Sequence, residues 1–178
     1  EEGIIKGMYL LDEGKDSKLK VKLLGCGTIL NEVRAAAEIL RNDFGVESDV
    51  WSTTSINELK REALAVERYN FLHPESEQRT AYVTECLAGE EPVIAATDYM
   101  RMYADQLRAH IPQAYKVLGT DGYGRSDTRE KLREFFEVNR YYVVIAALRS
   151  LQEQGKYKGA DVLKAMKKFN IDAEKVAP

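Results

Sequence analysis

One continuous stretch decides the fold of this chain: Lys20-Val21-Lys22-Leu23-Leu24-Gly25-Cys26-Gly27-Thr28. An apolar run that ends in two glycines is typical of a strand entering a tight turn. Thr28 is a predicted cap for the helix that follows, and Gly45 is well placed to end it. Apolar residues recur between them at helical spacing, namely at Ile29, Val33, Ala36, Ala37, Leu40 and Phe44. The stretch therefore predicts a strand, a turn and a helix in direct succession.

The same alternation continues to about Phe136. Ser55 and Glu58 form a capping box, and Asp98 and Ser126 or Asp127 are further predicted helix caps. Strands are expected over 49–54, 92–97 and 115–121, helices over 56–72, 80–88, 98–111 and from 126 or 127, and two last helices over 139–155 and around 162–169. This order predicts a parallel sheet covered by helices on both faces.

The first predicted strand, Ile4 to Leu11, does not fit the alternation. Only the polar turn 12–16 separates it from the strand that begins at Lys20, so no crossover helix lies between them. Two placements remain open. The strand pairs with its sequence neighbour as a hairpin, or it lies antiparallel at an edge of the sheet away from that neighbour.

Size and charge favour one soluble domain over residues 1–178, with no linker or internal repeat. The net charge of -3 opposes a nucleic-acid partner, because such a partner favours a basic surface. The longest apolar run, 141–148, is too short to cross a membrane. The acidic start without Met or a basic signal segment leads us to expect a fragment or processed product of a longer protein.

Cysteines and histidines give weak signals. Cys26 and Cys86 form no paired motif, and two free thiols suit a reducing cytoplasm. Cys26 lies where a helix dipole favours a thiolate, but no histidine is near in sequence to act as its base. His73 and His110 each end a predicted helix, where they satisfy last-turn carbonyls. We predict no catalytic residue and no metal ligand among them.

The turn at Gly25-Cys26-Gly27-Thr28 is half of a dinucleotide-binding fingerprint. Leu30 stands where the third glycine belongs, and no acidic residue ends the next strand. A tight strand-to-helix turn is therefore favoured over nucleotide binding.

Residues 119–129, called the contact loop below, form the densest polar segment. They follow a strand at the carboxyl edge of the sheet, where α/β folds place ligands. Arginines in a hydroxyl-rich turn suit a carboxylate or phosphate, yet they also suit the neighbouring aspartates or another domain. We expect a domain or subunit contact first and a ligand second, through Asp121, Arg125, Ser126, Asp127 and Arg129.

Motifs along nearly the whole chain resemble the C-terminal domain of homodimeric pyruvate dehydrogenases, the thiamine-diphosphate-dependent decarboxylating components of bacterial pyruvate dehydrogenase complexes. The run Leu118-Gly119-Thr120-Asp121-Gly122, with Gly124-Arg125-Ser126-Asp127, is specific to this group rather than to transketolases at large. Other matching stretches are Glu2-Gly3-Ile4-Ile5-Lys6-Gly7, Leu23-Leu24-Gly25, Asp49-Val50-Trp51-Ser52, Glu67-Arg68, Leu72-His73-Pro74, Thr97-Asp98-Tyr99-Met100 and Phe169-Asn170-Ile171-Asp172-Ala173. Cys26, Tyr69 and Tyr123 depart from the usual Ser, Trp and Phe.

The resemblance implies a three-layer α/β/α fold whose five-stranded mixed sheet is mostly parallel, with the first strand antiparallel. It implies a bacterial, cytoplasmic parent enzyme that decarboxylates pyruvate and passes the acetyl group to a lipoyl group of dihydrolipoyl acetyltransferase. Thiamine diphosphate and magnesium lie between the two other domains of the homodimer in that family, so neither is expected on this domain. A partner-docking or anion-binding module is the alternative, as is the equivalent domain of a transketolase or a branched-chain 2-oxoacid dehydrogenase.

Overall fold

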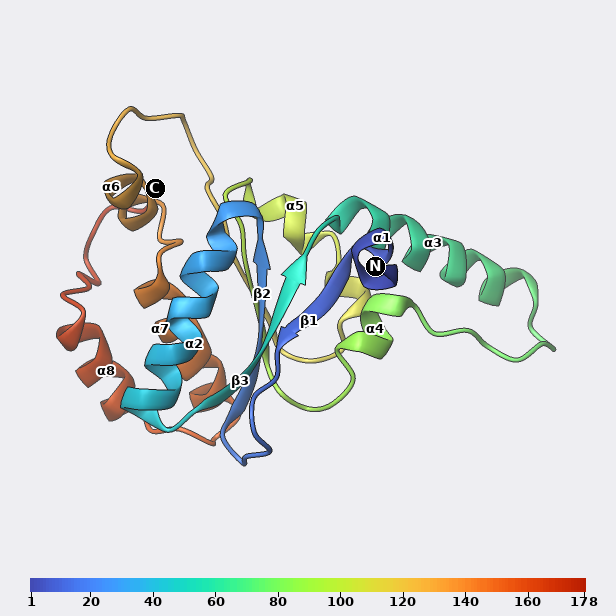
Figure 1. Ribbon diagram of the computed structural model, residues 1–178, viewed down its shortest axis with the longest axis horizontal. Coiled ribbons are helices and arrows are strands. Elements are labelled where there is room, and N and C mark those ends of the chain that lie inside the picture. Colours follow the sequence, from blue (N-terminus) through green and yellow to red (C-terminus); the bar gives the residue numbers. More distant parts are fainter.

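The computed structural model describes all residues from Glu1 to Pro178 and contains one five-stranded sheet (Figure 1). The strand order is β1-β3-β2-β4-β5, in which β2 to β5 are parallel and β1 lies antiparallel to β3 at an edge. The strands are β1 (Met8–Asp12), β2 (Lys20–Cys26), β3 (Glu47–Thr53), β4 (Val93–Ala96) and β5 (Tyr115–Leu118). The mixed sheet is confirmed, and the edge placement of the first strand is the correct one of the two.

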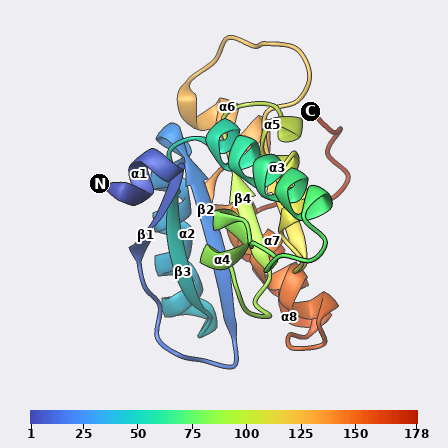
Figure 2. The ribbon, with the colours of Figure 1, turned by 90° about the vertical axis from the view of Figure 1, so that its right-hand side faces the viewer.

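Helices cover both faces of this sheet (Figures 1 and 2). One face is covered by α2 (Leu30–Phe44), α7 (Arg140–Glu153) and α8 (Gly159–Lys168). The other face is covered by α3 (Ile56–Leu72), α4 (Tyr82–Cys86) and α5 (Arg101–Asp105). The remaining elements are α1 (Glu2–Lys6), α6 (Arg129–Phe135) and the single turns η1 (Gly27–Ile29) and η2 (Arg108–His110).

Alternation along the strands divides the apolar core into two layers. Leu23 and Leu24 are adjacent in β2 and almost fully buried, but they join different clusters because successive side chains in a strand point to opposite faces. Leu23 packs with Val33 and Leu148 beneath α2 and α7, whereas Leu24 packs with Leu59 beneath α3. The predicted three-layer arrangement is confirmed.

The predicted strand Ile4 to Leu11 is wrong at its beginning. The chain forms the short helix α1 there, and Gly7, with φ of 102°, ends it before β1 starts at Met8. The side chains of Glu2 and Lys6 lie one helical turn apart and form an ion pair at 2.7 Å. Local helical pairing has overridden the β-propensity of the exposed Ile4 and Ile5.

Three predicted helix starts are also wrong. Thr28 caps nothing, since its hydroxyl points to the Asp98 carboxylate. The Asp98 carboxylate accepts this hydrogen bond and caps no helix, and α5 begins later, at Arg101. The helix expected over 98–111 is also shorter than predicted, because α5 ends at Asp105 and the separate turn η2 precedes Pro112. The helix expected from Ser126 or Asp127 begins at Arg129, because the Thr128 hydroxyl accepts a hydrogen bond from the backbone N–H of Lys131. Asn139 caps α7 at its predicted start, and the Ser55 hydroxyl caps α3. The predicted capping box is only half formed, because the Ser55 N–H donates to the Gly7 carbonyl and the Glu58 carboxylate binds Arg61 instead.

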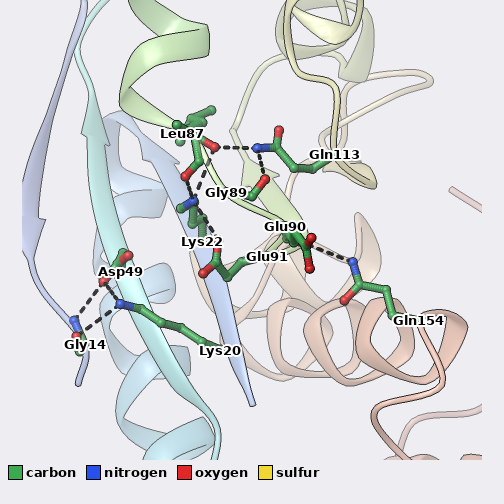
Figure 3. Close-up of polar contacts among 11 residues, drawn as sticks. Gly14, Lys20, Lys22, Asp49, Leu87, Gly89, Glu90, Glu91, Gln113 and Gln154 are labelled. Atoms are coloured by element: carbon green, nitrogen blue, oxygen red, sulfur yellow. Dashed lines mark hydrogen bonds and ion pairs between the residues drawn. The ribbon is translucent and has the colours of Figure 1, made fainter. Parts of the chain in front are cut away.

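A polar network ties the amino edge of the sheet together (Figure 3). Lys22 is buried and its ammonium donates to the carbonyls of Leu87 and Ala88 and to the carboxylate of Glu91 at 2.9 Å. Beside it, the Lys20 ammonium lies 2.9 Å from the Asp49 carboxylate. Lys22 fixes the segment between α4 and β4, and Lys20 and Asp49 hold Gly14 in the loop between β1 and β2. These charges serve the fold, so the opposite, carboxyl edge of the sheet is the place to look for function.

Candidate functional site at the carboxyl edge

The contact loop leaves the carboxyl end of β5 and arches away from the body before it reaches α6 (Figure 1). No backbone–backbone hydrogen bond involves residues 121–127. Tyr123, near the middle of the loop, is 95% exposed. The loop is therefore placed by its two ends and by a few side-chain contacts.

Asp121 anchors the beginning of the loop. Its carboxylate accepts a hydrogen bond from the backbone N–H of Arg101 at 2.8 Å and another from the Arg101 Nε at 2.6 Å. These hydrogen bonds hold the pKa of Asp121 below its usual range. The Thr120 hydroxyl donates to the Asp98 carbonyl at 2.8 Å. Among the predicted contact residues, Asp121 therefore already has a charged partner, Arg101, within this chain.

The other predicted contact residues differ in their partners. Asp127 accepts a hydrogen bond from the neighbouring Thr128 N–H at 2.7 Å, and Ser126 is exposed. The Arg125 guanidinium lies 4.1 Å from the centre of the Phe135 ring, a cation–π contact, and it has no ion pair. Arg129 makes no side-chain hydrogen bond or ion pair in the chain. Three charged groups of the loop therefore have no oppositely charged partner in the chain: Arg125, Asp127 and Arg129.

A cavity of about 650 Å³ lies between the carboxyl edge, the contact loop and α6. We call it the arginine cavity, because its lining includes the three arginines of this region. Its polar lining residues are Thr28, Asp98, Thr120, Arg125, Asp127, Arg129 and Arg133. The fold therefore brings Thr28, Asp98 and the contact loop together, although they lie far apart in the sequence.

A buried ionic clamp supports one wall of the arginine cavity. The Glu32 side chain is 7% exposed, and its carboxylate accepts from Arg133 Nη1 at 2.9 Å. Arg140 contacts the same carboxylate through its Nε at 3.0 Å and its Nη2 at 3.1 Å, a two-pronged contact. The clamp fastens α6 and the start of α7 to α2.

Sequence reasoning missed Glu32, although a signal for it exists. Glu32 lies three residues after Ile29 and four before Ala36, so it falls on the apolar face of α2. A carboxylate on a buried face requires a charged partner. The pattern does not say which arginine supplies it, because Arg133 and Arg140 are more than 100 residues away.

The glycine-rich turn after β2 is a close approach between backbones. A Cβ on Gly25 would lie 2.7 Å from the Cα of Leu30, so only glycine fits there without a shift. Cys26 is 8% exposed, and its burial raises the pKa of its thiol although a hydrogen bond with Thr97 lowers it. This geometry supports the tight-turn interpretation and opposes a reactive thiolate.

Gly25→Ala tests that interpretation. We expect the substitution to lower the free energy of unfolding by about 2 kcal/mol, the usual range for forcing an extra methyl into a packed site. Gly124→Ala is the matched control, because a Cβ there has no atom within 4 Å, and its stability should stay within about 0.5 kcal/mol of the unchanged chain. Urea unfolding measures both, and equal stabilities would contradict the close-approach argument.

The two histidines lie apart from the arginine cavity. His73 ends α3, and its Nδ1 lies 2.8 Å from the Tyr69 carbonyl, as the helix-end interpretation predicts. The prediction is wrong for His110, which ends η2 but contacts no carbonyl with its ring, because its Nε2 lies 3.1 Å from the Lys60 ammonium. Burial, followed by the charge of Lys60, lowers the pKa of His110. Neither histidine is brought to the contact loop.

The family model for the transketolase-like C-terminal domain matches residues 7–139, which is most of the chain and includes both β2 and the contact loop. This chain belongs to that family. The residues matched by the family model include all five strands of the sheet, among them the antiparallel edge strand, and the loop after β5.

Relatives with known names are similar over the whole chain. It is 58% identical over 181 residues to the pyruvate dehydrogenase E1 component of Pseudomonas aeruginosa, covering 100% of this chain and 20% of that protein. It is 51% identical over 179 residues to the pyruvate dehydrogenase E1 component of Escherichia coli, with the same two coverages. This transketolase-like C-terminal domain thus spans about one fifth of the length of these relatives.

Solved structures support the fold. The transketolase from Leishmania mexicana superposes with a TM-score of 0.60 and 16% identity, over 85% of this chain and 19% of that one. The split-gene transketolase, described as an inactive β4 tetramer, gives a TM-score of 0.55 at 18% identity, over 83% of this chain and 43% of that one.

None of the helices combines the length and the apolar character that a membrane span requires.

Proposed function

We propose that this chain is the C-terminal part of a pyruvate dehydrogenase E1 component. Such a parent decarboxylates pyruvate on thiamine diphosphate and reductively acetylates the lipoyl group of dihydrolipoyl acetyltransferase. The observation that carries the proposal is the 58% identity to the Pseudomonas aeruginosa protein, which extends over the whole chain. The matches to transketolases are at 16% and 18% identity, so they support the fold and not a transketolase activity.

The role we propose for residues 1–178 themselves is structural: one domain that supports the homodimer and the domains that carry the chemistry. Large exposed apolar side chains support this role, because a contact with another domain or subunit would remove their apolar surface from water. Ile5 on α1 is 76% exposed, Phe71 on the protruding end of α3 is 82% exposed and Met102 on α5 is 76% exposed (Figure 1). We infer that these residues contact the rest of the parent or its second copy.

This domain has no cluster of metal-ligating side chains that would support a role in binding magnesium. Nowhere do three or more His, Cys, Asp or Glu side chains lie close enough together to hold a metal ion. Our proposal assigns thiamine diphosphate and magnesium to the other domains of a parent that acts in the bacterial cytoplasm, a compartment that suits the two free cysteines. We assign no chemical step to this domain.

The test compares three proteins: the full-length parent, the parent without residues 1–178, and the 178-residue chain alone. We expect the chain alone to fold and to consume no pyruvate. We expect most of the shortened parent to be monomeric and its activity to be at least tenfold lower than that of the full-length parent. The reason is that the apolar contacts of α1, α3 and α5 are gone. Sedimentation and pyruvate-dependent reduction of an artificial electron acceptor measure these properties.

Two results would contradict the proposal. Tight binding of thiamine diphosphate by the 178-residue chain, measured by calorimetry, would give this domain a direct role in the chemistry. Faster turnover of a branched-chain 2-oxoacid or a ketose phosphate than of pyruvate by the full-length parent would favour the alternative families.

A further inference from the structure

Three polar side chains form a row across the sheet just below its carboxyl edge. Cys26 ends β2 in register with Thr53, which ends β3, and Thr97 directly follows β4 on the other side of β2. All three fall on the face that α3 covers, because side chains alternate along a strand and the residues two positions earlier in each strand pack beneath α3. Cys26, Thr53 and Thr97 are 8%, 4% and 1% exposed, so the row lies in the core.

Thr53 differs from its two neighbours, because its hydroxyl has no hydrogen-bond partner in the chain. The Thr97 hydroxyl accepts from the Tyr99 N–H at 3.1 Å and also forms a hydrogen bond with the Cys26 thiol. A buried hydroxyl without a partner is unfavourable, since it has given up its hydrogen bonds to water. A ligand that hydrogen-bonds the Thr53 hydroxyl would remove this cost.

A small cavity of about 10 Å³ lies beside the row, and all three of its members line it. The other lining residues are apolar, such as Ile56 and Leu107, except for the hydroxyl of Tyr115, which donates to the Ala104 carbonyl at 2.9 Å. This volume is about the least that holds one water molecule, so it excludes an organic ligand or a hydrated ion. The cavity therefore combines room for a single water with a hydroxyl that needs a partner.

We propose that this cavity binds one ordered water molecule, which is the partner of the Thr53 hydroxyl. The Cys26 thiol and the hydroxyls of Thr97 and Tyr115 line the same cavity and supply the further polar groups that a buried water requires. The water joins the end of β3 to its neighbouring strands, and Cys26 has a structural role beside it in place of a chemical one. This site depends on the fold of the chain and not on the identity of the parent enzyme.

Crystal structures of the 178-residue chain and of its Thr53→Val variant test the proposal, because valine has the shape of threonine but forms no hydrogen bond. In the unchanged chain we expect one fully occupied water within hydrogen-bonding distance of Thr53 Oγ1. In Thr53→Val we expect the density of this water to weaken or disappear. The equilibrium constant for unfolding, measured in urea, should rise about fivefold, as expected for the net loss of one hydrogen bond.

Thr80→Val is the control, because Thr80 is exposed in the loop between α3 and α4 and the substitution changes the same atoms outside the core. This variant should keep the water and unfold with an equilibrium constant within about twofold of the unchanged chain. A dry cavity in the unchanged chain would overturn the proposal. Greater stability of Thr53→Val would overturn it as well, because removing an unpaired hydroxyl from a dry core stabilises a protein.

Discussion

Glu32→Gln is expected to lower the free energy of unfolding by about 3 kcal/mol, because breaking a buried charge pair leaves its partners uncompensated. The substitution keeps the shape of the side chain but leaves the guanidinium groups of Arg133 and Arg140 facing a neutral amide. The Arg140 side chain is 42% exposed and water compensates it in part, so we expect the lower end of the usual range. Urea unfolding followed by circular dichroism measures the change.

Glu38→Gln is the matched control for this prediction. Glu38 lies on the same helix, α2, but it is exposed and has no ion pair, so its replacement should change stability by less than about 0.5 kcal/mol. Equal stabilities for the two variants would show that the clamp does not hold α6 and α7 to α2.

The clamp also gives stability a predictable dependence on pH. Burial alone would raise the pKa of Glu32, but the hydrogen bonds and charge of Arg140 and the charge of Arg133 outweigh burial, so this pKa lies below its usual value. The folded state therefore holds the carboxylate more strongly charged than the unfolded state does. Its contribution is complete at neutral pH and is lost as the pH falls through the folded pKa. The stability difference between the unchanged chain and Glu32→Gln should shrink below about pH 4.

Lys22→Met is expected to lower the free energy of unfolding by about 2–3 kcal/mol, because it removes the donor from several acceptors at once. Methionine fills similar space, so packing is largely retained. The carbonyl of Ala88 and the carboxylate of Glu91 lose their partner, while the carbonyl of Leu87 keeps a hydrogen bond from Gln113 (Figure 3). We expect the segment between α4 and β4 to loosen first, which hydrogen exchange of its amides measures.

Lys116→Met separates this effect from a general effect of losing a lysine from the sheet. Lys116 lies on β5 with its side chain exposed, and it has no ion pair or side-chain hydrogen bond. Its replacement should leave stability and amide exchange nearly unchanged. Comparable losses for the two variants would mean that the network around Lys22 contributes nothing specific.

Local patterns predicted most of the sheet and failed mainly at helix starts. The strand at Lys20, the helix that Gly45 ends and the caps Ser55 and Asn139 depend on residues a few positions apart, so the sequence contains all the information they need. Thr28 and Asp98 are good capping residues that cap nothing, since the fold places them beside each other, 70 positions apart in sequence. Their hydrogen bond to each other replaces the local one that propensity predicts.

The contact loop was predicted from its polar residues, but their roles came from the structure. Asp121 and Arg125 look equivalent in the sequence as charged residues of one turn. The structure separates them, because Arg101 neutralises Asp121 while Arg125 keeps no carboxylate partner. Which charge is free depends on partners that other strands and helices supply.

The sequence by itself determined the order of strands and helices from β2 onward, the two faces of the sheet and the resemblance to the transketolase-like C-terminal domain. The physical reason is that helical spacing, strand alternation and turn glycines act over a few residues. The tertiary structure alone decided the Glu32 clamp, the occupied Asp121 and the arginine cavity. Each of these depends on charges that packing brings within hydrogen-bonding distance from remote parts of the chain, and no local pattern encodes that distance.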